Sequence, residues 1–101
     1  MSDTVLKQYL QPFPGISSFI FAPPATEGSR TWIFRAAEEP ERILDFHLAS
    51  LLQQGWRVIE STPSIVAQRA GTELSVSALR RRDETRIVYE VHTGSEARLG
   101  K

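Results

Sequence analysis

The 101-residue sequence contains no cysteine, which excludes disulfide bridges, thiolate nucleophiles and metal sites built on cysteine. It also lacks any apolar run near the roughly 18 residues that a membrane-spanning helix needs. Residues 1–9 lack the basic start and apolar stretch of a secretory signal peptide. We therefore expect no membrane span, and a cytoplasmic location for the chain as given or a periplasmic or exported one if a signal has been removed.

The chain lacks an excess of charge of either sign, because 12 lysines and arginines balance 12 aspartates and glutamates. A dedicated nucleic-acid-binding protein usually carries a strong basic excess, so we do not expect nucleic acid as the partner. A net charge near zero also leaves little long-range repulsion between copies. The charge balance therefore permits self-association.

The sequence has none of the common catalytic or nucleotide-binding motifs, such as Gly-x-Gly-x-x-Gly, the phosphate-binding loop, Gly-x-Ser-x-Gly or His-Glu-x-x-His. These absences argue against the familiar nucleotide-binding and hydrolase folds. We expect no cofactor and no metal, and we favour a protein that is not an enzyme.

The residues that are present predict a single small α+β domain. Pro12-Phe13-Pro14-Gly15 favours an extended N-terminal arm over residues 1–15. Alternation of apolar and polar residues predicts strands at 17–22, 30–36, 56–60, 65–69, 73–79 and 85–92, with a helix over 40–54. We expect an antiparallel sheet of four to six strands with one helix on its dry face, roughly β-β-α-β-β-β, in a domain spanning 16–93. Residues 94–101 are expected to form a flexible tail.

The two ends of the expected helix carry clear signals. Pro40 suits the first helical position, and the acidic side chains of Glu38, Glu39 and Glu41 complement the positive end of the helix dipole. Gly55 suits the left-handed residue just beyond the helix, and Trp56 can fold back on its last turn. Helix electrostatics thus explains the three glutamates, which could otherwise be taken for a carboxylate cluster.

Pro14-Gly15 is followed by an aromatic strand and then by a helix with Ile43, Phe46 and Leu51 that closes in Gly55-Trp56. In these features the chain resembles a loose group of small bacterial domains that have no assigned function, many of which look like exported lipoproteins. The similarity spans most of residues 14–91. This chain has Phe46-His47 where such helices tend to carry Phe-Tyr, and it has no lipoprotein cysteine. The resemblance implies the fold described above and no activity.

The two histidines are the first candidates for chemistry. His47 falls between Ile43 and Leu51 on the apolar stripe of the helix, at about 100° per residue. It could contact a ligand in a pocket between helix and sheet, lined also by Trp32, Trp56 and Tyr89. The alternative is that these four side chains are packed core residues. His92 is expected on the wet face of a strand, and a zinc site would need both histidines and a carboxylate together.

A basic cluster, Arg80-Arg81-Arg82, lies at the turn between the last two expected strands. On a hairpin tip it is a candidate anion patch for phosphate, RNA or an acidic partner. The alternative is a charged turn that keeps the sheet soluble, because Asp83 and Glu84 follow directly.

The helix is apolar over a wider arc than one sheet face requires. If Ile43, Phe46, His47 and Leu51 face the sheet, then Leu44, Leu48 and Leu52 form a second apolar line, here called the leucine ridge. Either the N-terminal arm covers this ridge, or the ridge is an interface with a second copy or another protein. We therefore expect a non-enzymatic protein-interaction or binding module, with a homodimer through the helix as one form. The alternative is a small dimeric α+β enzyme or ligand carrier that uses His47 and Trp56.

Overall fold

The computed structural model describes residues 6–7, 9–21 and 28–93, so the expected tail and residues 1–5 and 8 of the arm lie outside the described residues. The elements along the chain are β1 (Ile16–Phe21), β2 (Ser29–Ala36), α2 (Pro40–Gln53), β3 (Arg57–Glu60), β4 (Ile65–Arg69), β5 (Thr72–Arg81) and β6 (Glu84–Thr93). The expected α+β class is confirmed, with one helix and a six-stranded sheet. Four strands follow α2, one more than in the expected β-β-α-β-β-β order.

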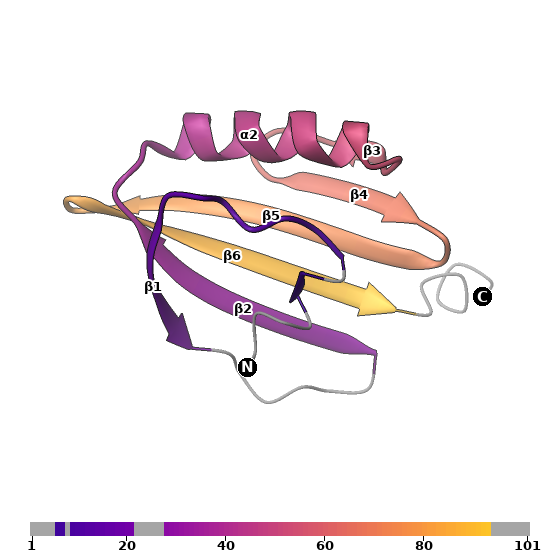
Figure 1. Ribbon diagram of the computed structural model, residues 1–101, viewed down its shortest axis with the longest axis horizontal. Coiled ribbons are helices and arrows are strands. Elements are labelled where there is room, and N and C mark those ends of the chain that lie inside the picture. Colours follow the sequence, from indigo (N-terminus) through magenta and orange to yellow (C-terminus); the bar gives the residue numbers. More distant parts are fainter. Residues whose placement is uncertain (1–5, 8, 22–27, 94–101) are drawn as a thin grey trace.

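The six strands form one antiparallel sheet in the order β1-β2-β6-β5-β4-β3. β6 lies near the middle of the sheet and pairs along its length with β2 and β5 (Figure 1). β5 extends to Arg81, two residues further than expected, because only Arg82 and Asp83 form the turn before β6. The β4–β5 turn is equally tight, with positive φ at Ala70 and Gly71, as two-residue hairpin turns require.

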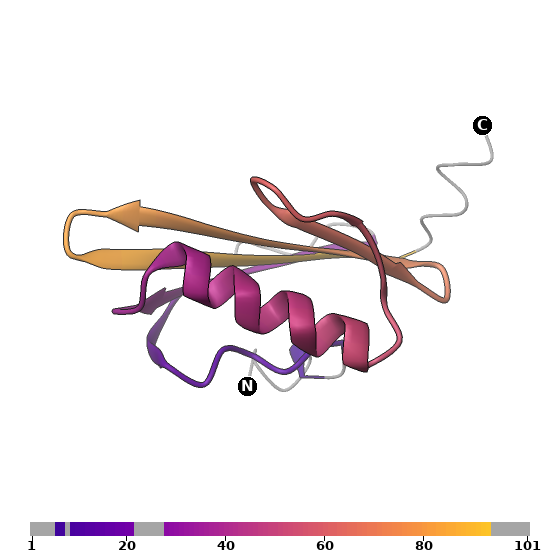
Figure 2. The same ribbon diagram turned by 90° about the horizontal axis from the view of Figure 1, so that it is seen from above.

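One face of the sheet is covered by two segments that lie side by side, α2 and the N-terminal arm (Figures 1 and 2). α2 contacts β3, β4 and β5. The core between the two layers consists of the buried residues Leu6, Leu10, Trp32, Phe34, Ala36, Ile43, Leu51, Trp56, Ile65, Ala67, Leu74, Val76, Ile87, Tyr89 and Val91. Among the described residues, no helix covers the opposite face (Figure 2).

Both ends of α2 are formed as their residues predict. Pro40 is the first helical residue. Gly55 has a φ of 86°, and the Trp56 N–H donates to the carbonyl of Leu51 at 3.0 Å, which closes the helix in a Schellman motif. The Arg69 side chain from β4 donates to the carbonyl of Gln54 at 2.8 Å and lies 4.4 Å from the centre of the Trp56 ring. The helix therefore ends with its terminal carbonyls hydrogen-bonded and a cation beside them. Within the described residues no helix has the length and apolar character needed to cross a membrane.

Candidate functional site

His47 lies at the meeting point of helix, sheet and arm. Its ring is fully buried, and Nε2 is 2.7 Å from the hydroxyl oxygen of Tyr89 on β6. The same hydroxyl accepts a hydrogen bond of 3.0 Å from the backbone N–H of Phe13 in the arm. The Phe13 ring packs against the rings of Phe46 and His47, at centroid distances of 5.5 and 6.5 Å. One phenol thus links three segments that are far apart in the sequence.

Burial determines the ionisation of this pair. Loss of solvation lowers the pKa of His47 from 6.5 to about 4, so the ring is neutral near pH 7. Burial raises the pKa of the Tyr89 hydroxyl well above its usual range, although the Phe13 N–H opposes the shift. A neutral, fully buried imidazole between aromatic rings has no access to a substrate in this conformation. Its geometry is that of a packed, hydrogen-bonded core histidine.

The other residues of the expected helix–sheet pocket are also packed. Trp32, Trp56 and Tyr89 are 2%, 3% and 0% exposed. Two buried nitrogens in this region, His47 Nδ1 and Trp56 Nε1, have no hydrogen-bond partner. The structure therefore brings His47 and Tyr89 into contact, and it fills the space between helix and sheet with side chains.

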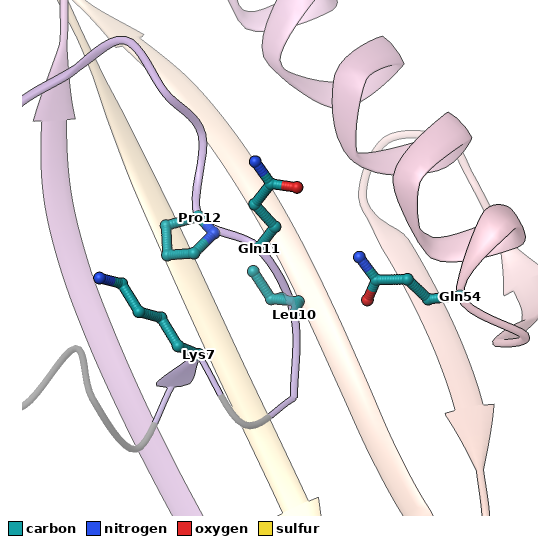
Figure 3. Close-up of a pocket in the computed structure, with 5 residues that line it drawn as sticks. All are labelled: Lys7, Leu10, Gln11, Pro12 and Gln54. Carbon is teal, nitrogen blue, oxygen red and sulfur yellow. The ribbon is translucent and has the colours of Figure 1, made fainter.

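Two hollows of the surface lie where the arm meets α2, outside the expected helix–sheet pocket. Figure 3 shows a cleft of about 400 Å³ near the end of the helix, which is lined by Lys7, Leu10, Gln11, Pro12 and Gln54. A wider groove of about 740 Å³ near the start of the helix is lined by Phe13, Glu38, Arg42, Asp45 and Phe46. None of the four expected pocket residues lines either hollow. No sequence pattern signals these hollows, because the arm has no periodicity that would place it beside the helix.

The leucine ridge lies on the flank of α2 that faces away from the arm. At about 100° per residue, Leu48 is displaced from the buried line through His47 by about 100° in one direction, and Phe46 by about 100° in the other. The arm contacts Phe46 through Phe13. Leu44 and Leu48 are partly buried against the core, whereas Leu52 is 56% exposed.

The three arginines of the expected anion patch do not point the same way. Arg80 lies on the helix side of β5, where Nη1 is 3.8 Å from a carboxylate oxygen of Glu39 and 3.4 Å from the Thr85 hydroxyl. Arg81 pairs across the hairpin with Glu84, which places it on the opposite face. Arg82 occupies the turn with a φ of 59°. Arg80 and Arg81 therefore face opposite sides of the sheet.

His92 lies on the uncovered face of β6, with Nε2 3.8 Å from a carboxylate oxygen of Glu90. The sheet separates it from His47, which lies on the covered face. Across residues 6–7, 9–21 and 28–93 no group of three or more histidine, cysteine or acidic side chains could hold a metal ion.

Comparisons of the chain with protein-family models, with curated proteins and with solved structures find no significant match.

Proposed function

We propose that this protein is a non-enzymatic protein-interaction module that uses the leucine ridge of α2 as its docking surface. The observation that carries the proposal is the exposure of Leu52, at 56%, on a helix whose other flank is already covered by the arm. A leucine left in water forgoes roughly 1.5–3 kcal/mol of burial free energy. A partner that covers this flank would recover part of that free energy.

The position of the arm supports the proposal. The arm is the segment that could have covered the ridge, but it contacts the opposite flank of the helix through Phe13 and buries Leu6 and Leu10 in the core. Leu44 and Leu48 are partly buried against the core, whereas Leu52 is exposed. The most exposed part of the ridge is therefore at the C-terminal end of α2. Its occupant is either a second copy of this chain or another protein.

The alternative function, a small enzyme or ligand carrier with His47 and Trp56 in its pocket, has weaker support. Both side chains belong to the packed interior and line neither of the two hollows. A ligand would first have to displace the Phe13 ring, which packs against His47.

The experiment compares two variants that add the same charge to the same end of α2. Leu52→Glu places a carboxylate on the ridge, and Gln53→Glu places one on an exposed position about 100° away. We expect Leu52→Glu to lose partner binding by about tenfold or more, because a buried carboxylate is costly, and Gln53→Glu to retain it. Light scattering reports on pairing with a second copy, and affinity purification with mass spectrometry reports on another protein.

Thermal unfolding of both variants tests whether the fold is intact, which we expect because both positions are exposed. Equal solution mass and the same bound proteins for Leu52→Glu and Gln53→Glu would show that the ridge is not a docking surface.

A further inference from the structure

The uncovered face of the sheet has a regular arrangement of side chains, set by the register of its three long strands. Ile33, Val88 and Ser77 lie opposite one another on β2, β6 and β5 and form a row across the strands near the middle of the face. All three are partly buried, and no described helix covers them (Figure 2). Ser77 shares a hydrogen bond of 3.0 Å with Ser64, which lies beside it in the β3–β4 connection. This central row is only weakly polar, and charged residues lie on either side of it.

The charges on this face are segregated. Toward the β5–β6 turn lie three arginines and one glutamate, which are Arg35, Arg81, Arg86 and Glu84. Arg35 and Arg86 both contact the single carboxylate of Glu84, at 3.2 Å. Toward the other end of the strands lie three glutamates and one arginine, which are Glu60, Glu73, Glu90 and Arg57. One end of the face therefore carries an excess of two positive charges, and the other end an excess of two negative charges.

From this pattern we infer that the uncovered sheet face binds a second copy of this chain, face to face, about a two-fold axis that runs across the strands along the central row. Such an axis places the basic end of each face over the acidic end of the other. On β6, Arg86 and Glu90 are equally spaced on either side of Val88, so Arg86 of each copy lies over Glu90 of its mate. On β5, Arg81 and Glu73 are related in the same way about Ser77.

The geometry suits two stacked sheets. Aligned sheets pack about 10 Å apart with their strands within roughly 30° of each other, so pairs close to the axis stay in register despite the twist. Leu79, which is 60% exposed, lies on the same face and would be covered by the second copy. The face measures roughly 600 Å² in plan at about 3.3 Å per residue and 4.8 Å per strand. That is below the ~800 Å² per partner of a standard interface, so the dimer should be weak and sensitive to salt.

A second copy fits this face better than a nucleic acid does. A phosphate backbone would be attracted to the arginine end and repelled by Glu73 and Glu90 at the other. The inference is independent of the leucine ridge, because α2 lies on the covered face of the sheet (Figure 2).

Charge exchange at Arg86 and Glu90 tests the inference. Their side chains are 38% and 43% exposed, so substitution should leave the fold intact, as thermal unfolding will verify. By symmetry each single variant, Arg86→Glu or Glu90→Arg, brings like charges together twice. We expect each to weaken dimerisation about 10- to 100-fold, measured by sedimentation velocity at about 0.05 M salt.

The double variant, Arg86→Glu with Glu90→Arg, should dimerise like the unmodified chain, because its charges are exchanged and still complementary. Mixing the two single variants should also restore dimers, because one copy then carries glutamate at both positions and the other carries arginine at both. Raising the salt to about 0.5 M should weaken the unmodified dimer. The ridge variant Leu52→Glu should have no effect on it.

Three results would overturn the inference. The first is a chain that stays monomeric at low salt up to its solubility limit. The second is a dimer that the single charge variants leave intact. The third is a dimer that dissociates with Leu52→Glu but not with Arg86→Glu, which would assign self-association to the leucine ridge instead.

Discussion

Tyr89 shows how one side chain can connect the arm to the core. Its hydroxyl accepts a hydrogen bond from the Phe13 N–H and shares a second hydrogen bond with Nε2 of His47. The other ring nitrogen of His47, Nδ1, is buried and has no partner. The buried ring thus keeps one unpaired polar group, and a second proton on it would have to be buried in the same apolar surroundings.

This environment predicts that stability falls in mild acid. Burial lowers the pKa of His47 to about 4 in the folded protein, whereas its ordinary pKa of 6.5 applies in the unfolded chain. On acidification the unfolded chain therefore binds the extra proton first. The stability that depends on a neutral His47 ring is fully present above about pH 6.5. It is lost as the pH falls toward 4, and the total loss is about 3 kcal/mol. Urea unfolding of the wild type and of His47→Leu between pH 7 and 4 measures the difference.

The leucine variant serves as the reference because it keeps every carboxylate that titrates in the same range. We expect the stability of His47→Leu to fall less steeply between pH 6.5 and 4 than that of the wild type. Parallel curves for the two proteins would show that His47 gains its proton as easily in the folded state as in the unfolded one.

At the scale of the secondary-structure elements, α2 is the one whose ends are specified most directly by single residues. Gly55 has a φ of 86°, and a β-carbon added there would meet no atom within 4 Å. Any cost of Gly55→Ala is therefore conformational. We expect a loss of about 1–2 kcal/mol, measured by urea unfolding, and a much smaller loss for the neighbouring Gln54→Ala, whose φ is −91°. Equal losses would show that the left-handed conformation is not required.

The elements were largely predictable from local pattern. Strict alternation in β5 and β6 determines which side chains face the core, and Pro40 and Gly55 mark the ends of α2, because these signals depend on backbone geometry. The directions of the Arg80 and Arg81 side chains were harder to predict from the sequence. A run of three arginines reads as one cluster, but extension of β5 to Arg81 sends consecutive side chains to opposite faces of the sheet.

The site was less predictable than the elements. The pattern places His47 on the buried stripe of α2, yet its contact with Tyr89 joins residues 42 positions apart, and the Phe13 bond to the same hydroxyl spans 76. No local signal encodes such pairings, because they depend on how the helix and the arm divide one face of the sheet. Leu52 is exposed for the same reason, because the arm contacts the other flank of α2.

For the whole molecule, that division means that a single helix is too narrow to cover a six-stranded sheet. α2 contacts β3, β4 and β5, and the arm lies beside it in front of β6 (Figure 1). The arm buries Leu6 and Leu10 to 0% and 2% exposure. The described part of the arm therefore belongs to the core, although it contains no strand. Because the arm and α2 share one face of the sheet, the opposite face and the leucine ridge have no described segment packed over them.

We therefore expect truncation in the arm to destabilise the whole domain. Leu6→Ala should lower the free energy of unfolding by about 2–4 kcal/mol, as for other buried leucines, in a single cooperative transition followed by tryptophan fluorescence and circular dichroism. Gln11→Ala, at an exposed position of the same arm, should cost less than about 0.5 kcal/mol. A loss near zero for Leu6→Ala would mean that the arm rests on a core that is complete without it. The sheet beside α2 would then be a second apolar surface, besides the leucine ridge, that a partner could cover.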